Sequence, residues 1–350
     1  MSVDLSKLVY KYKISLDELS GKRIAIDAYN MIYQFLSIIR QPDGTPLTDS
    51  EGNVTSHMSG LFYRTIDLMD KGIQPIYVFD GIPSVLKQKT IAARMKRRED
   101  ALAAWESAKE RGEMEEAKMH AQASTRITKY VVETSKELLD HMGVHYMVAP
   151  SEGEAQASIM CKEGLVYAAA SQDYDTLLFG APLVARNVTL SGRRKLPRKN
   201  IYVNIEPEMM SLQETLKALG ITHEKLIWIG IMLGTDFNNG IKGIGPKTAL
   251  KMAKSVPSIK ALEEHIKEKY NAEFELDINE VIELFDKPEV KKVSEQEIQK
   301  GLEKKPDKEA LTRFMCDKHG FDPVRIGKYA DKLVSDKESH RQIGLGSWMK

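Results

Sequence analysis

The sequence predicts an α/β fold in which a mostly parallel central sheet is flanked by helices. Short apolar runs with the character of buried strands recur along the first half of the chain, and helical patterns separate them. The run VYAAASQD (166–173) is apolar over nearly its whole length, as is typical of a strand covered on both faces. Strands that alternate with helices usually form a parallel sheet, because each helix carries the chain back to the same end of the sheet.

The predicted elements follow one another in a regular order. A helical pattern over 28–40 follows the first strand, and another over 154–164 follows the third. The predicted strands are RIAID (23–27), QPIYVFD (74–80), VHYMVAP (144–150) and VYAAASQD (166–173), with further strands at APLVARN (181–187) and IYVNI (201–205).

The segment from about 84 to 142 carries no strand pattern. Its helical patterns, with one break near Gly112, predict a helical insertion between two strands. From 207 onward the sequence predicts helices joined by Gly and Pro, with a glycine hairpin in GIKGIGPKTALKMA (240–253). The charged segment 264–310 predicts surface helices and loops, and the last dozen residues predict a flexible tail.

The composition excludes several classes of protein. The 350 residues are 42% apolar and 29% charged, which is typical of a globular chain with one large or two ordinary domains. Cys161 and Cys316 are too few and too far apart for a disulfide framework or a cysteine metal site. The charged N-terminus lacks the apolar core of a signal peptide, and the longest apolar run, LIWIGIMLG, is too short to cross a bilayer. We therefore expect an intracellular protein without a membrane segment.

Acidic residues occur where the predicted strands end. Because the carboxyl ends of parallel strands share one edge of a sheet, these side chains should converge there. A further acid follows an apolar helix in the motif LGTD. The complete set is Asp27, Asp80, Glu152, Glu154, Asp173, Asp175 and Asp236.

The motif APSEGEA (149–155) also permits a purely structural interpretation. Ser151 and Glu154 have the spacing of a capping box, and acids in a first helical turn suit the helix dipole. The whole set argues for more than capping, since two carboxylates roughly 5 Å apart repel by about 3 kcal/mol at an effective dielectric constant near 20. Oxygen ligands in this number predict two hard divalent ions, Mg²⁺ or Mn²⁺, that activate water against a phosphodiester.

Basic residues follow the second acid closely. The run LKQKTIAARMKRRED begins shortly after Asp80, and Lys87 and Arg94 share one helix face because they are seven residues apart. A solvated helix face is the structural alternative, but the position near the acids favours phosphate binding. The hairpin IKGIGPK, with Lys242, Lys247, Lys251 and Lys254, predicts a helix-hairpin-helix that contacts the DNA backbone. The basic loop GRRKLPRK (192–199) has no assigned role.

The motifs IDAYNMIYQFL, VFDGIPSVLK, APSEGEA, SQDYDTLLFG and LGTDFNNGIKGIGPKTA together resemble the flap endonucleases of the archaeal type. The resemblance covers nearly the whole chain. It implies a PIN-like nuclease fold with a helical arch, and hydrolysis of DNA at the base of 5′ flaps with two Mg²⁺, which Mn²⁺ can replace. It also implies 5′–3′ exonuclease activity and roles in DNA replication, through Okazaki fragment maturation, and in base excision repair.

The resemblance also implies a division of the chain. The nuclease core would comprise an N-terminal half (1–101), including the start of the arch, and an internal half (119–262) with the helix-hairpin-helix at about 239–254. A charged helical region (263–339) and a flexible tail (340–350) would follow.

Site roles follow from the same resemblance. The seven acids would be metal-site residues, with Asp80, Glu152, Glu154 and Asp173 ligating directly and Asp175 and Asp236 serving the second ion. Lys87 and Arg94 would grip the scissile phosphate at the base of the arch. The hairpin would hold a K⁺ ion. The residues expected to contact DNA are Tyr33, Arg40, Arg64, Glu152, Gly234, Asp236, Lys242, Gly243, Gly245 and Lys247.

The C-terminal sequence QIGLGSWM resembles a sliding-clamp binding box. Gln342, Leu345 and Trp348 match its glutamine, aliphatic and first aromatic positions, while Met349 replaces the usual second aromatic residue. A frayed terminus is the structural alternative. The resemblance further implies a monomeric cytoplasmic protein associated with the nucleoid of a prokaryotic or archaeal cell.

Other functions remain open at this point. A non-catalytic DNA-junction binder could keep the same fold, although the complete set of acids argues against it. A nuclease of the same family that acts on bubbles or nicks commonly carries a longer insertion or extension than this chain offers. A metal-dependent phosphatase would leave the arch and the hairpin unexplained.

Overall fold

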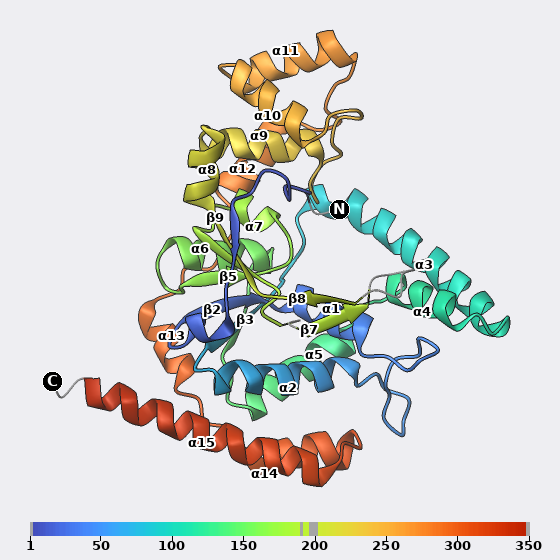
Figure 1. The fold of residues 1–350 in the computed structure, drawn as a ribbon, viewed down its shortest axis with the longest axis vertical. Coiled ribbons are helices and arrows are strands. Elements are labelled where there is room, and N and C mark those ends of the chain that lie inside the picture. The colour runs from blue at the N-terminus through green and yellow to red at the C-terminus, as the bar shows by residue number, and fades with distance from the viewer. Residues whose placement is uncertain (1–2, 190–191, 196–201, 348–350) are drawn as a thin grey trace.

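A computed structural model describes the backbone of residues 3–189, 192–195 and 202–347, and the side chains of residues 3–189 and 205–335. Its centre is a seven-stranded sheet with the strand order β1-β9-β6-β5-β2-β3-β4 (Figure 1). A separate two-stranded sheet pairs β7 with β8. The strands are β1 (Lys11–Lys13), β2 (Arg23–Asp27), β3 (Gln74–Phe79), β4 (Tyr146–Val148), β5 (Ala168–Ala170), β6 (Leu183–Arg186), β7 (Gly192–Lys195), β8 (Tyr202–Ile205) and β9 (Glu208–Ser211).

The sheet is parallel where the sequence predicts it and antiparallel at one edge. Strands β2 to β6 pair in parallel, so the carboxyl ends of β2, β3, β4 and β5 lie together. Strand β9 pairs antiparallel with β6, and β1 pairs antiparallel with β9. The predicted strand IYVNI belongs to the small sheet instead of the main one, because β8 pairs only with β7 among the described strands.

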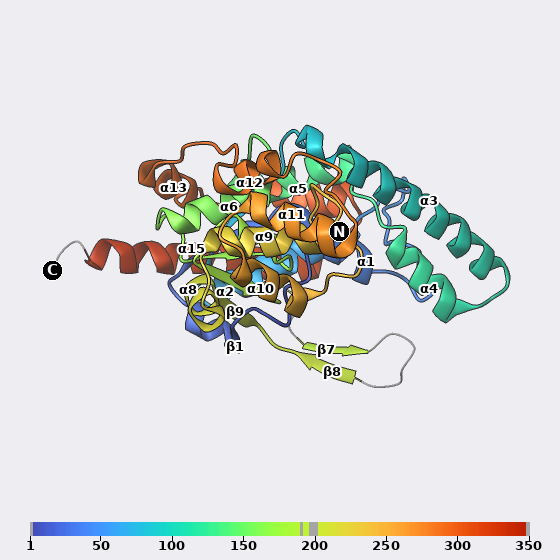
Figure 2. The same ribbon diagram turned by 90° about the horizontal axis from the view of Figure 1, so that it is seen from above.

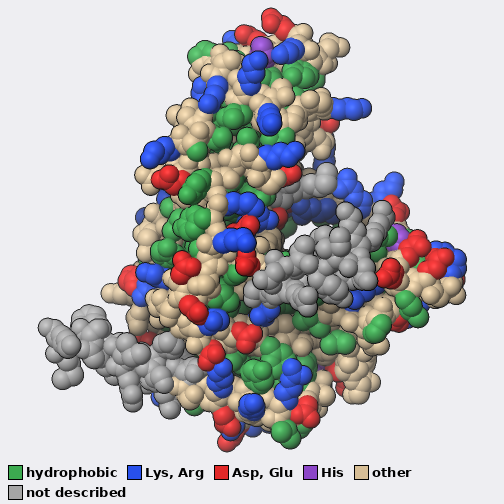
Figure 3. Space-filling view, in the orientation of Figure 1, with side chains coloured by type: hydrophobic (Ala, Val, Ile, Leu, Met, Phe, Trp, Pro, Cys, Tyr) green, Lys and Arg blue, Asp and Glu red, His purple; other side chains and the backbone are tan. Residues whose placement is uncertain are grey.

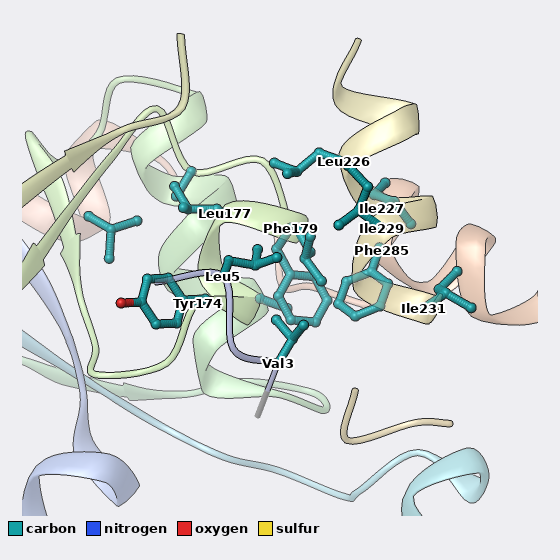
Figure 4. Packing of buried hydrophobic residues seen from close by; sticks show 14 of the residues in the cluster. Val3, Leu5, Tyr174, Leu177, Phe179, Leu226, Ile227, Ile229, Ile231 and Phe285 are labelled. Atoms are coloured by element: carbon teal, nitrogen blue, oxygen red, sulfur yellow. The ribbon is translucent and has the colours of Figure 1, made fainter. Parts of the chain in front are cut away.

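The two faces of the central sheet bury two separate cores. Along β2, Ile24 and Ile26 belong to one core and Ala25 to the other, as the alternation of side chains in a strand requires. Helices α1, α2, α5, α14 and α15 contribute to the core on one face, and α6, α7 and α9 to α13 contribute to the core on the other. Figure 4 shows part of the second core, where Leu226, Ile227 and Ile229 of α9 pack with Leu177 and Phe179.

Short connections join most of the helices. The α-helices are α1 (Ala28–Ile38), α2 (Ser56–Asp70), α3 (Gln88–Glu110), α4 (Met114–Ala123), α5 (Lys129–His141), α6 (Gly153–Lys162), α7 (Asp175–Leu178), α8 (Leu212–Leu219), α9 (His223–Leu233), α10 (Pro246–Ser255), α11 (Ile259–Tyr270), α12 (Ile278–Asp286), α13 (Glu295–Leu302), α14 (Lys308–Thr312) and α15 (Pro323–Ser347). Within the described chain, no helix combines the length and apolar character needed to cross a membrane.

The insertion between β3 and β4 forms a projecting helical arch, as predicted. Helices α3 and α4 extend away from the sheet on one side, and the β7–β8 hairpin projects nearby (Figure 2). Of the residues of α3, only Ala108 is buried. The arch is held at its outer end by the loop after α1, where Trp105 Nε1 donates to the Asp43 carbonyl (3.0 Å) and Lys109 pairs with the Asp43 carboxylate (2.9 Å).

The C-terminal segment is helical where the sequence predicts a tail. Helix α15 continues through Ser347, so the backbone of residues 340–347 extends this helix. Pro323 is its first residue, where proline is tolerated, and no later proline interrupts the described turns. The positions of Trp348 and Met349, and the side chains of Gln342 and Leu345, lie outside the described residues.

A buried hydrogen bond joins the loop before α2 to the C-terminal region. His319 Nδ1 lies 2.9 Å from Asp49 Oδ2, and both side chains are almost completely buried. The hydrogen bond with His319 lowers the pKa of Asp49 to about 2. A lowered carboxyl pKa stabilises the folded state above the unfolded-state value near 3.9, and this stabilisation is lost as pH falls toward 2.

We therefore expect Asp49→Asn to lower the midpoint of urea unfolding at pH 6 to 7. The difference from the parent protein should shrink as pH falls from about 4 toward 2. Unfolding curves for both proteins across this range measure the effect. A difference that stays constant with pH would show that the Asp49 charge does not contribute.

Candidate active site

The predicted acids lie along the carboxyl edge of β2, β3, β4 and β5. Asp27 ends β2 and caps α1, since its Oδ1 accepts from the backbone N–H of Asn30 (2.9 Å). Asp80 follows β3, and Glu152 is the N-cap of α6 after β4. Asp173 and Asp175 follow β5, with Asp175 opening α7. The parallel pairing of these strands brings the acids to one edge, as predicted.

Two glycines hold the loops after β3 and β4 against each other. The N–H of Gly81 donates to the Ser151 carbonyl (2.7 Å), and a Cβ on Gly81 would lie only 2.1 Å from the Ala149 carbonyl oxygen. The N–H of Gly153 donates to Asp80 Oδ1 (2.7 Å), which a Cβ on this glycine would approach to 2.9 Å. The glycine between the two glutamates of APSEGEA therefore lets α6 begin directly beside Asp80.

The capping-box interpretation of this motif is wrong. Glu152, not Ser151, is the N-cap of α6, and its side chain makes no capping hydrogen bond. The carboxylate of Glu154 accepts from the backbone N–H of Thr176 (3.1 Å) and from the Thr176 hydroxyl. Glu152 lies before the first turn of α6 and Glu154 lies within it. Both side chains therefore face the acidic edge and do not cap the helix.

The acids form one electrostatic cluster. Burial raises the pKa of Asp27, and the charges of Asp80 and Asp173 raise it further. Burial likewise raises the pKa of Glu154, with Asp173 and Asp175 adding to the effect. These interactions show that the acids following β2, β3 and β5 lie close to one another and to Glu154 of α6.

The cluster extends to Asp236, the acid after α9. Burial raises the pKa of Asp175, and the charge of Asp236 raises it further. Burial and Glu152 raise the pKa of Asp80 to about 6, although Lys87 and the Gly153 N–H act against this. Simultaneous ionisation of all these carboxyls is therefore unfavourable without cations.

Lys87 and Arg94 supply two of these cations. Lys87 pairs with Glu152 and lies 3.5 Å from Asp236 Oδ2, while Arg94 pairs with Asp236. Burial would lower the pKa of Lys87, but Glu152 and Asp236 raise it above its usual value. Burial alone would also raise the pKa of Asp236, but Lys87 and Arg94 hold it below the ordinary value. The base of the arch thus contacts the acids directly, as the shared helix face of these two residues predicts.

The acids fit divalent ions by their chemistry. In the part of the chain that the structure describes, no three acidic, histidine or cysteine side chains are closed around one point as ligands of an ion. Lys87 and Arg94 instead pair with two of the acids. Carboxylate oxygens are nevertheless the ligands that Mg²⁺ and Mn²⁺ prefer, and the buried carboxyls with raised pKa values need positive charge nearby.

Sequence reasoning missed the neutral donors that hold these carboxylates. Asn30 Nδ2 donates to Asp173 Oδ2 (3.1 Å), Thr176 donates to Glu154, and the N–H of Val3 donates to Asp175 Oδ1 (3.2 Å). The position of Asn30 in the first turn after Asp27 offered a signal, because a side chain there lies beside the strand end. No comparable signal marks Val3.

The predicted DNA contacts of the first helix occupy different settings. Tyr33 is partly exposed, and the Arg98 guanidinium carbon lies 5.8 Å from the centre of its ring. Arg40 donates to the Leu36 and Gly44 carbonyls (2.7 Å each) and to Thr125 Oγ1 (2.9 Å). Arg40 therefore joins the loop after α1 to the arch, in addition to any role with DNA.

Arg64 lies on α2 and pairs with Asp67 (3.3 Å). Helix α2 belongs to the core that also contains α15 and lies on the face of the sheet opposite α9. The structure therefore does not bring Arg64 together with the helix-hairpin-helix.

The glycine hairpin has the geometry that the sequence predicts. Gly234 has φ of 94°, and a Cβ there would lie 2.7 Å from the backbone nitrogen of Gly240. Gly243 has φ of 88°, and Gly245 is the N-cap of α10. Ile241 and Ile244 are buried, which anchors the hairpin in the core. Its flanking lysines carry their charges at the surface beside the hairpin, and the members of this set are Lys242, Lys247, Lys251 and Lys254.

Comparison with known proteins assigns this combination of acids, arch and hairpin to a family. Flap endonuclease 1 of Pyrococcus furiosus is 47% identical to the chain over 351 residues, covering 100% of both sequences. The chain belongs to the flap endonuclease family. Two family models match separate regions, the XPG N-terminal domain at residues 3–101 and the XPG I-region at 143–236. All seven predicted acids of this chain lie within the two matched regions.

Solved structures agree with this assignment. Flap endonuclease-1 from Methanococcus jannaschii is 38% identical, with a TM-score of 0.74 and coverage of 97% of this chain and 99% of that one. The catalytic core of Rad2 in complex with DNA substrate is 25% identical, with a TM-score of 0.65 and coverage of 93% and 96%. The predicted PIN-like α/β fold and the assignment to the flap endonucleases, a family of metal-dependent DNA nucleases, are confirmed.

Proposed function

We propose that this chain hydrolyses a DNA phosphodiester at the base of a 5′ flap with two Mg²⁺ ions, which Mn²⁺ can replace. One observation carries the proposal: in a flap endonuclease chain, Lys87 and Arg94 at the base of the arch contact the same buried acids that would hold the ions. The 5′–3′ exonuclease activity and the roles in Okazaki fragment maturation and base excision repair belong to the same proposal.

The residues divide the work of the reaction among them. Asp80, Glu152, Glu154 and Asp173 would hold one ion, and Asp175 and Asp236 would serve the other, with Asp27 completing the negative pocket. When bound, such an ion pair supplies an activated water and neutralises the leaving oxygen. Lys87 and Arg94 neutralise the scissile phosphate once substrate displaces their pairs with Glu152 and Asp236.

The arch supplies the path for the single strand. In Figure 3 an opening separates the arch from the body of the molecule, with Lys and Arg side chains along its rim. Positive side chains at such an opening attract the phosphates of DNA and orient them toward the acids. Tyr33 lies partly exposed beside Arg98 and would stack with a base near the scissile bond.

The test compares substrates of one sequence and different shape. We expect the purified protein with Mg²⁺ to cleave a 5′-flap duplex far faster than a bubble or a 3′ flap, and not at all in EDTA. Equal cleavage of bubble and flap would favour an excision-type nuclease. Binding without cleavage under every metal condition would favour a non-catalytic junction protein.

The exposed lysines of the hairpin should contribute affinity and not catalysis. Lys242→Gln with Lys247→Gln removes two positive charges beside the backbone N–H groups of the hairpin. We expect weaker binding and a salt dependence of log Kd reduced by about 2, roughly one for each phosphate that the variant no longer neutralises. The rate at saturating DNA should not change. An unaltered salt dependence would place the DNA duplex elsewhere.

The proposed K⁺ ion would bind at the same hairpin.

The C-terminal segment would bind a sliding clamp through Gln342, Leu345, Trp348 and Met349. Met is flexible enough to replace an aromatic residue in such a contact, so the substitution should weaken binding without preventing it. We expect deletion of residues 340–350 to leave cleavage of free flaps intact and to remove stimulation by the clamp. Stimulation that survives the deletion would assign the contact to another surface.

The protein would act as a cytoplasmic monomer on nucleoid DNA.

A further inference from the structure

A chain of side-chain amides leads from helix α1 into the acidic cluster. Asn30 Nδ2 donates to Asp173 Oδ2 at 3.1 Å. Gln34, one turn further along α1, donates from Nε2 to Asn30 Oδ1. The backbone N–H of Asn30 meanwhile donates to Asp27 Oδ1. Asn30 therefore contacts two of the acids at once. Both Asn30 and Gln34 are uncharged.

The hydrogen bonds determine the orientation of both amides. Carboxyl oxygens are chiefly acceptors, so the amide nitrogen of Asn30 faces Asp173. The Asn30 oxygen is then directed to Gln34, whose nitrogen must face it in turn. Reversing either amide would place two acceptors or two donors against each other. The series Gln34 to Asn30 to Asp173 therefore has one direction, and it ends on Oδ2 of the Asp173 carboxyl.

These donors are neutral, in contrast to those on the other side of the cluster. Glu152 and Asp236 pair with the cations Lys87 and Arg94. Asp173 instead receives an amide from Asn30 at the point where its charge also acts on Glu154 and Asp27. An amide donor holds a carboxylate in place without cancelling its charge, so this side of the cluster keeps its attraction for a cation.

The end of the series opens into a small cavity. The side-chain oxygen of Gln34, Oε1, is buried and accepts no hydrogen bond from the described residues. A small pocket, partly open to solvent, lies beside Gln34 and is also lined by Asp27, Ser171 and Thr189. A buried amide oxygen needs a donor, and a water admitted through this cavity can supply one.

We propose that Asn30 and Gln34 are positioning residues that hold Asp173 in the orientation for binding a divalent cation. This inference rests on the proposed function and assigns its metal site two residues that are not ligands. Groups that orient metal ligands typically change metal affinity by about 10- to 100-fold when removed. Asn30 should have the larger effect because it contacts the carboxylate, and Gln34 the smaller one because it acts through Asn30.

The experiment measures Mn²⁺ binding to the full chain without DNA, by the electron paramagnetic resonance signal of free Mn²⁺. The variants are Asn30→Leu and Gln34→Met, which are similar in size to the native residues and uncharged. Ser37→Ala is the matched control, since Ser37 lies on the same helix but donates to the Tyr33 carbonyl, away from the acids. We expect Mn²⁺ affinity to fall about 10-fold in Asn30→Leu, less in Gln34→Met, and not in Ser37→Ala.

Cleavage provides the second measurement. The Mn²⁺ concentration for half-maximal cleavage should rise by the same factor as the binding constant, while the rate at saturating Mn²⁺ stays within about threefold of the parent. A purely structural role would lower the saturating rate and leave the metal dependence unchanged.

The outcomes separate this inference from the proposed function. Parent-like Mn²⁺ binding by both variants, in a protein that cleaves flaps, would overturn the positioning role and leave the nuclease function standing. A parent chain that neither binds Mn²⁺ nor cleaves would overturn both. If Asn30→Leu unfolds, as judged by thermal melting without metal, Gln34→Met decides the question alone.

Discussion

Asp175→Asn is expected to reduce flap cleavage by at least about 1000-fold while raising the thermal stability of the metal-free protein. Asn keeps the size of Asp and retains an oxygen to accept from the Val3 N–H, so the local fold should persist. It removes a buried negative charge that lies against Asp236 and Asp173. The negative charge of Asp175 destabilises the fold without metal, and the same charge attracts the cation when metal is present.

The sign of the stability change follows from the raised pKa of Asp175. A carboxyl whose pKa is higher in the folded state than in the unfolded state destabilises the fold when it is ionised. This penalty is absent below the unfolded value near 3.9 and grows as pH rises above it. The advantage of Asp175→Asn should therefore be larger at pH 8 than at pH 5. Adding Mg²⁺ should stabilise the parent more than the variant.

Thermal melting with EDTA and with Mg²⁺, together with single-turnover cleavage, tests both halves. Glu163→Gln is a matched control, because this exposed acid at the end of α6 lies outside the cluster. DNA affinity of Asp175→Asn should stay equal or increase, since one charge that repels phosphate is gone. Normal cleavage by the variant would remove Asp175 from the metal site. A loss of stability would mean that its charge is already neutralised within the fold.

The acids could be predicted because each one has a local signal. Asp27 and Asp80 end apolar runs that are typical of buried strands, and the topology rule for parallel sheets brings such ends together. The spacing of Lys87 and Arg94 likewise predicts one face of a helix. Local pattern and general topology together therefore predict the charged half of the site.

The neutral half of the site depends on contacts that no local pattern contains. The Val3 N–H reaches Asp175 across 172 positions of the chain, and Asn30 reaches Asp173 across 143. The same holds for the two antiparallel strands at one side of the sheet. Strand β9, with the sequence EMMS, and β1, with KYK, have little strand propensity, and they form because β6 and β9 offer unpaired backbone groups to them. Propensity predicts the parallel central strands better than these two short antiparallel strands, whose pairing is decided by the tertiary fold.

Lys87→Met should have the opposite stability effect and a comparable loss of activity. Lys87 is largely buried between Glu152 and Asp236, so its removal takes a counter-ion away from both acids and should lower the melting temperature in EDTA. Cleavage should fall by about 100- to 1000-fold because the scissile phosphate loses a cation. DNA affinity should fall less than about 10-fold, since Lys87 would be only one of many phosphate contacts.

Two further variants isolate the cause. Lys89→Met removes an exposed charge two residues away and should leave both rate and stability close to those of the parent. Arg94→Ala should slow cleavage strongly with a smaller effect on stability, because the Arg94 side chain is 35% exposed whereas that of Lys87 is 14% exposed. If Lys87→Met lowers affinity as much as it lowers the rate, Lys87 is an anchor for DNA and not part of the reaction. If Lys89→Met slows cleavage equally, the general charge of the helix, and not the contact with Glu152 and Asp236, accounts for the effect.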